Sequence, residues 1–142
     1  MIVSKEFKWD AAHRIHLHQG KCRHLHGHTY HMSMELEGDL DAYGMVVDFN
    51  EIKQIISPYI AQLDHTTIIA ADDMELREMF DLKSWKYFLL PYPSTAENLC
   101  KFFVDTLLEH HSDFLQSKKI KSLAVKIHET ESSFAYLHKS LV

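Results

Sequence analysis

Histidine residues crowd one short part of the sequence and suggest metal chemistry. Seven of the 12 histidines lie between residues 13 and 31. His26 and His28 stand two residues apart where apolar and polar residues alternate, so on a strand both project from the apolar face, about 6.7 Å apart. His13 ends an earlier stretch on the same apolar parity. If the two stretches form an antiparallel hairpin, three imidazoles meet at one end, and three nitrogen ligands with a fourth position open are typical of catalytic zinc.

A simpler interpretation is that these are partly buried histidines with ordinary hydrogen-bond partners, as a lone histidine usually is. Three of them on matching parities around one hairpin end favour a metal. The loop histidines His16, His18 and His24 have no such parity, and we interpret them as solvent-exposed or as neighbours of the ligands.

Cys22 lies in the polar loop between the two stretches, four residues before His26. Nearby Lys21, Arg23 and a metal would favour its thiolate, which is the nucleophilic form of cysteine. The alternative is a small buried apolar residue, the usual fate of a free cysteine. That alternative suits Cys100, which falls on the apolar side of a predicted helix.

Three acidic or basic side chains elsewhere could take part in the same chemistry. Asp64 precedes His65, and a carboxylate beside a histidine can fix its tautomer and raise its basicity, although adjacent pairs of this kind are common. Glu129 has the parity of the apolar row 123–127 and should point inward with it. A buried carboxylate needs a partner. Either a ligand that offers N–H donors or a salt bridge with Lys or Arg would serve.

Four alternating stretches and two helices must position these residues. Alternation predicts strands over residues 3–13, 26–38, 122–127 and 134–141. Helices are predicted to begin at Asp48 and Ser94, each followed three residues later by a glutamate as in a capping box. Pro58 predicts a kink or a break of the first helix near Ser57.

Residues 66–93 are harder to assign, with a short helix over 72–80 and a short strand over 87–90 as the best interpretation. The sequence therefore predicts an α+β fold of order ββααββ. We expect a four-stranded antiparallel sheet with two helices on one face, in a single domain over residues 1–142.

Composition excludes several other classes. Apolar residues make up 46% and charged residues 25%, as in a soluble globular protein. No apolar run approaches the ~20 residues of a membrane span, and the first residues do not resemble a signal peptide. The net charge of −5 argues against nucleic-acid binding. Two cysteines are too few for a disulfide framework, so we expect a cytoplasmic protein.

Taken together, these residues resemble the family of 6-pyruvoyl tetrahydropterin synthases and 6-carboxy-5,6,7,8-tetrahydropterin synthases. The resemblance spans nearly the whole chain, and Cys22 with the His26-Gly27-His28 triplet and His13 is its most specific part. The other matching segments are residues 7–14, 47–49, 63–65, 94–98 and 129–130.

The resemblance implies one Zn²⁺ per chain on His13, His26 and His28. It implies a catalytic thiol at Cys22, with Asp64 and His65 as its acid/base partners, and a pterin ring held by Glu129 and Thr95. The implied architecture is the tunnelling fold (T-fold), usually a homohexamer formed as a dimer of trimers with its sites between subunits. The implied substrate is 7,8-dihydroneopterin triphosphate.

The short spacing from Cys22 to His26 resembles the bacterial queuosine-pathway members. They form 6-carboxy-5,6,7,8-tetrahydropterin with loss of acetaldehyde and triphosphate, in the biosynthesis of 7-deazapurines. Lys21, Arg23 and Arg14 are candidates to hold the triphosphate. One alternative is a 6-pyruvoyl tetrahydropterin synthase, which only eliminates triphosphate. A second, non-enzymatic alternative is a histidine-rich metal-binding protein. Residues 66–93 depart from the family pattern, and they affect the rim of the site.

Overall fold

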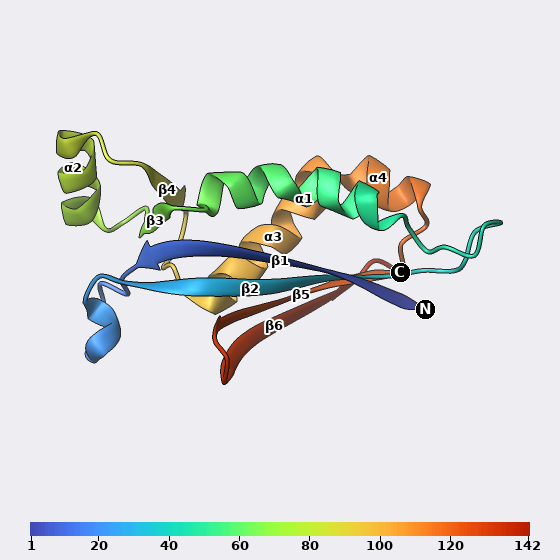
Figure 1. The fold of residues 1–142 in the computed structure, drawn as a ribbon, viewed down its shortest axis with the longest axis horizontal. Coiled ribbons are helices and arrows are strands. Elements are labelled where there is room, and N and C mark those ends of the chain that lie inside the picture. Colours follow the sequence, from blue (N-terminus) through green and yellow to red (C-terminus); the bar gives the residue numbers. More distant parts are fainter.

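A single curled, six-stranded sheet organises the protein (Figure 1), described by a computed structural model of residues 1–142. The strands run in the order β4-β3-β1-β2-β5-β6. Their bounds are β1 Ile2–His13, β2 His26–Glu37, β3 Thr66–Ala70, β4 Tyr87–Leu90, β5 Ser122–Thr130 and β6 Ser133–Ser140. The helices are α1 Phe49–Leu63, α2 Met74–Lys83, α3 Ala96–His110 and α4 Ser112–Ser117, with a single 3₁₀ turn at Lys21–Arg23.

The four predicted strands are present as β1, β2, β5 and β6, and neighbours among them pair antiparallel. The predicted four-stranded antiparallel sheet is nevertheless wrong, because β3 and β4 extend it by two parallel pairings. All five residues of β3 are buried, so both of its faces are covered and no alternation marks it in the sequence. The short strand expected over 87–90 is β4, and the short helix expected over 72–80 is α2.

The helix ends follow the predicted capping chemistry with one shift. Asp48 caps α1 and forms a full capping box with Glu51. The residue that caps α3 is Thr95, not Ser94, since the Thr95 hydroxyl accepts a hydrogen bond from the Asn98 N–H at 3.2 Å. Ser94 is instead completely buried.

Pro58 does not break α1, which runs without interruption from Phe49 to Leu63. A proline costs a helix interior about 3 kcal/mol, so other interactions must hold the segment together. Ile56 and Leu63, on either side of the proline, are almost fully buried, and their packing keeps the helix whole.

The main core lies between the helices and one face of the sheet (Figure 1). Alternate residues of β1 and β2 supply it, as their two-residue period requires. Trp9 of β1 stacks on Tyr30 of β2 with ring centroids 5.1 Å apart, and Phe103 of α3 lies 6.0 Å from Trp9. At the end of this hairpin away from the N-terminus, the apolar row gives way to histidines.

The segment that carries α2 forms a small annex at the end of the molecule away from both termini (Figure 1). Ile69, Leu76 and Phe80 make a second, separate cluster of buried residues there. No helix of the structure has the length and apolar character that crossing a membrane requires.

Candidate metal centre and active site

Three histidines meet where β1 ends and β2 begins. The antiparallel register places His13 opposite His26 and Ala11 opposite His28, so the trio shares the helix-covered face of the sheet. Ring centroids lie 4.7 Å apart for His13 and His26, 4.8 Å for His26 and His28, and 5.1 Å for His13 and His28. One ring nitrogen from each lies within 4.8 Å of the others. The predicted convergence of these three side chains is confirmed.

Backbone carbonyls orient two of the three rings. The Nδ1–H of His13 donates to the carbonyl of Ser94, and the Nδ1–H of His26 donates to the carbonyl of His24, both at 2.6 Å. Because a carbonyl can only accept, each of these Nε2 atoms keeps its lone pair. Metal-binding histidines in proteins are commonly oriented in this way.

The remaining nitrogens at the centre of the trio are buried without a partner. His13 Nε2 and His28 Nε2 have no hydrogen bond. Burial lowers the pKa of His13 to about 4, with a smaller contribution from the two neighbouring histidines. Burial also lowers the pKa of His28. Neutral imidazoles with free lone pairs at this spacing are suitable ligands for Zn²⁺.

Glu129 faces the trio from β5, as its parity predicted. Its Oε1 lies 3.8 Å from His13 Nε2 and its Oε2 lies 3.9 Å from His28 Nε2. An irregularity in the pairing with β6 falls at this residue, and such bulges re-aim side chains beside functional sites. Burial raises the pKa of the Glu129 carboxyl, and the nearby Glu97 contributes to the rise. No Lys or Arg pairs with Glu129, so a salt bridge to such a residue does not explain its position.

Tyr30 lies beside the trio, and sequence analysis missed it. Its ring centroid is 5.6 Å from that of His28 and 5.9 Å from that of His13. Burial, and then the charge of Glu129, raise the pKa of its hydroxyl far above the usual value, so the proton stays on the oxygen. The alternation had counted Tyr30 only as an apolar residue, although a hydroxyl next to two histidines was a visible signal.

Asp64 and His65 stand at the end of α1, where the chain passes β1. Asp64 Oδ1 accepts from the Asp10 N–H at 2.9 Å, and Oδ2 lies 3.0 Å from His65 Nδ1. The hydrogen bond from Asp10, followed by the contact with His65, lowers the pKa of Asp64, so it remains a carboxylate that orients the ring.

The backbone of His65 is held in an unusual conformation, with φ of 56°. A non-glycine residue in this left-handed region is strained, and such residues gather at functional sites. The His65 N–H donates to the Asp10 carbonyl at 2.7 Å, which stabilises the bend. Lys86 Nζ donates to the carbonyl of Asp64 at 2.8 Å, a contact with no local sequence signal.

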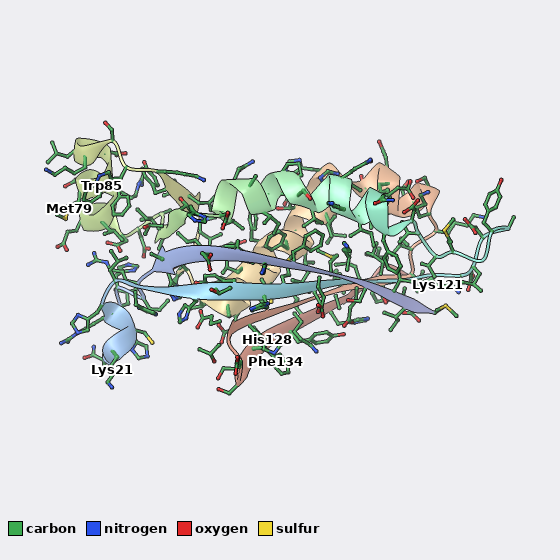
Figure 2. The ribbon with its side chains drawn as sticks, in the orientation of Figure 1. Lys21, Met79, Trp85, Lys121, His128 and Phe134 are labelled. Carbon is green, nitrogen blue, oxygen red and sulfur yellow. The ribbon has the colours of Figure 1, made fainter.

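Cys22 is exposed in the 3₁₀ turn of the loop between β1 and β2. This loop projects from the sheet, with Lys21 pointing outward (Figure 2). An open hollow of about 470 Å³ beside His65 is lined chiefly by residues of β1 and β2 that face away from the trio, Asp10, Ala12, Gly27 and Thr29, and Cys22 is not among its lining residues. Within one chain, then, the structure unites the histidine trio with Glu129, whereas His65 lines a separate hollow and Cys22 stands in the projecting loop.

Two other predicted residues have defined partners. Thr95 caps α3 and directly follows Ser94, whose carbonyl holds His13. Arg14 is paired with Asp73 at 2.6 and 2.7 Å and with Glu75 at 3.4 Å. Its guanidinium is thus occupied by carboxylates, which leaves Lys21 and Arg23 as the better candidates for an anionic ligand.

Comparison with known proteins agrees with this arrangement. The family model described as 6-pyruvoyl tetrahydropterin synthase matches residues 2–140. The chain belongs to this family. A Haemophilus influenzae relative, named 6-carboxy-5,6,7,8-tetrahydropterin synthase, is 32% identical over 93% of this chain and 94% of its own. A relative of the same name from Aquifex aeolicus is 31% identical over 94% of each chain.

Solved structures of other family members share the fold. The 6-pyruvoyl tetrahydropterin synthase of Plasmodium falciparum superposes with a TM-score of 0.80 and 22% identity, over 99% of this chain and 98% of that one. The Caenorhabditis elegans synthase gives a TM-score of 0.67 at 22% identity, over 99% and 96%. The resemblance to this family and its T-fold architecture is therefore confirmed, with six strands in the sheet.

Proposed function

We propose that this chain is a zinc-dependent lyase that converts 7,8-dihydroneopterin triphosphate and one water to 6-carboxy-5,6,7,8-tetrahydropterin, releasing acetaldehyde and triphosphate. The observation that carries the proposal is the convergence of three histidines, two of which have buried Nε2 atoms without partners. Relatives named 6-carboxy-5,6,7,8-tetrahydropterin synthase, about 30% identical over most of the chain, support the choice of product.

His13, His26 and His28 would hold the Zn²⁺. When bound, the ion supplies Lewis-acid chemistry that lowers the pKa of a substrate hydroxyl and stabilises negative charge on oxygen. The carbonyls of Ser94 and His24 keep the rings of His13 and His26 in the ligating orientation.

Proton transfer would fall to Cys22 and to His65. Asp64 holds Nδ1 of His65, which leaves Nε2 to accept or deliver a proton, while a Cys22 thiolate works on another face of the substrate. Glu129 offers carboxylate oxygens to the N–H groups of a pterin ring, and Thr95 lies at the adjoining start of α3.

The active assembly is proposed to be a homohexamer, a dimer of trimers with sites between subunits, in the cytoplasm and in the queuosine pathway. Two features support an assembly: β4 and β6 leave unpaired backbone at the sheet edges, and Cys22 does not line the hollow beside His65. Light scattering on active protein should give a multiple of the 16.6 kDa chain mass. An active monomer would refute the assembly.

A non-catalytic metal buffer would need the loop histidines as additional ligands, and two of them already have partners within the chain. His16 Nε2 faces Asp72 at 3.3 Å, and His18 Nδ1 accepts from the Gly20 N–H at 2.8 Å. The structure contains a single cluster of three potential ligands, so metal titration should give one tight site per chain. Several weak sites would favour the buffer.

Mass analysis of the product formed from 7,8-dihydroneopterin triphosphate is the decisive test. The carboxylated tetrahydropterin together with acetaldehyde is the expected result. A 6-pyruvoyl product without acetaldehyde would identify the pyruvoyl synthase instead. Zinc-loaded protein that leaves this substrate unchanged would overturn the proposal.

A further inference from the structure

Three of the seven buried side-chain nitrogen and oxygen atoms that lack a hydrogen-bond partner lie close together. His13 Nε2, His28 Nε2 and the Tyr30 hydroxyl all lack partners, and their rings lie within 6 Å of one another. The two nitrogens are explained by a metal. The hydroxyl is not, because a neutral phenol is a hydrogen-bond donor at neutral pH and a poor metal ligand beside three imidazoles.

The environment of Tyr30 explains why the fold itself does not satisfy the hydroxyl. The residue is 0% exposed, so bulk water does not reach it. Its ring stacks nearly parallel on Trp9, with 8° between the planes, and stands almost perpendicular to the rings of His13 and His28. Packing on three aromatic rings fixes the phenol without providing an acceptor for its proton.

An unpaired buried hydroxyl destabilises a fold relative to the same ring without the oxygen. Phenylalanine would make the same stack on Trp9. The hydroxyl therefore stabilises the protein only when a bound ligand supplies the hydrogen-bond acceptor that the free chain lacks. The space between the histidines and Glu129 is where such a partner would enter.

We propose that Tyr30 is a substrate-binding residue whose hydroxyl donates a hydrogen bond to an oxygen of the ligand held between the three histidines and Glu129. The acceptor belongs to the oxygen-bearing side chain of the ligand, a hydroxyl, alkoxide or carbonyl oxygen, and not to its ring. The inference rests on the proposed function for the nature of that ligand. Tyr30 should therefore favour ligands that place an acceptor oxygen next to its hydroxyl.

The chain offers a matched control in Tyr59, whose hydroxyl is satisfied inside the fold by His111 Nε2 at 2.9 Å. Tyr30→Phe and Tyr59→Phe remove the same atom from the same residue type. Metal-free Tyr30→Phe should keep or raise the melting temperature, whereas Tyr59→Phe should lower it. Both variants should bind one zinc per chain. Tyr30→Phe should lose about 10- to 100-fold in kcat/KM, as expected for a hydrogen bond to a charged or developing oxygen, and Tyr59→Phe should lose none.

A Tyr30→Phe enzyme with wild-type kcat/KM would overturn the proposal, and so would a lower melting temperature of its metal-free form. A structural role of the Tyr30 hydroxyl would lower the melting temperature, whereas a role in substrate binding lowers kcat/KM and leaves the melting temperature unchanged or higher.

If the wild-type protein does not turn over the pterin triphosphate, the proposed function fails and a substrate-independent probe decides this inference. Acetohydroxamate, which presents two oxygens to a metal, is titrated into the cobalt-substituted proteins and followed by visible absorption. Weaker binding by Tyr30→Phe than by Tyr59→Phe supports the assigned hydroxyl, and equal binding overturns it.

Discussion

The histidine trio and the Asp64–His65 pair are both histidine sites, and their environments in the fold are opposite. The side chain of His13 is 2% exposed and that of His65 is 78% exposed. Regular strand register positions the trio, whereas the pair stands at a helix end where the backbone of His65 adopts a strained conformation. One site is complete within a single chain, and the other presents its imidazole to an incoming group.

The difference shows which half of the chemistry depends on the protein interior. The core holds a buried set of metal ligands in place, and removal of one ring should release the metal ion. The exposed His65, which we propose as an acid/base group, can be removed with little effect on the fold, and its removal should lower the rate. The two halves should therefore fail separately when they are mutated.

Removal of a buried ligand should have the largest effect. His28→Ala should lose its zinc and all measurable turnover, because two imidazoles bind the ion far more weakly than three. Elemental analysis of the purified protein measures the metal content. His24→Ala, from the neighbouring loop, is the control and should retain its zinc, since only the backbone carbonyl of His24 contacts the trio. Full zinc content in His28→Ala would disprove the assignment of the ligands.

Removal of the exposed thiol should spare the metal and abolish most of the rate. Cys22→Ala should keep one zinc per chain and lose about 10²–10⁴-fold in kcat, the usual contribution of a proton-transfer group. Steady-state kinetics and metal analysis of the same preparation check both statements. Cys100→Ala is the control, since Cys100 is buried in the core and should affect stability instead. Near wild-type turnover by Cys22→Ala would leave the proton transfers to His65 alone.

Acidification of the metal-free protein should reveal the burial of His13 as a loss of stability. Folded His13 resists protonation until about pH 4, whereas in the unfolded chain its pKa is near 6.5. The unfolded state therefore binds more protons between these values, and the free energy of unfolding should fall by up to about 3 kcal/mol as the pH drops through this window. Urea denaturation of the metal-free protein at pH 7.5 and at pH 4.5 measures the loss.

The variant His13→Asn should flatten this pH dependence, because it removes the buried imidazole. Equal pH dependence in wild type and His13→Asn would contradict the burial argument.

The smallest effect is expected at Thr95, which connects the core to the site. Thr95→Ala removes the cap of α3 and should cost about 1 kcal/mol of stability, while Thr95→Ser, which keeps a hydroxyl, should restore most of it. If Thr95 also touches the pterin, KM should rise in the alanine variant beyond what the serine variant shows. Identical melting temperatures for wild type and alanine would exclude the capping role.

The same contrast explains what the sequence could predict. The two-residue period of strands, which is fixed by backbone geometry, predicts the face that the trio and Glu129 share. Their meeting depended in addition on the antiparallel hairpin assumed for residues 3–13 and 26–38. β3 escaped prediction as a strand because its five buried residues show no alternation. The shift of the α3 cap from Ser94 to Thr95 reflects two adjacent residues of nearly equal capping ability.

The partners of the reactive groups were harder to foresee than the groups themselves. The contact of Lys86 with the Asp64 carbonyl joins residues 22 positions apart in the chain, so only the folded arrangement reveals it. The same holds for Arg14, whose charge suggested an anionic ligand before the structure paired it with Asp73.

The small annex that carries α2 has a dynamic consequence. Only Ile69, Leu76 and Phe80 form its buried cluster, and Met79 and Trp85 lie on its surface (Figure 2). Segments with so few buried contacts open locally, well below the free energy of global unfolding, and exchange their amide hydrogens early. The bond from Arg14 to Asp73 connects this segment to the residue that follows His13. Occupation of the metal site should therefore slow amide exchange in α2, which makes this distant helix a reporter of whether the enzyme is loaded.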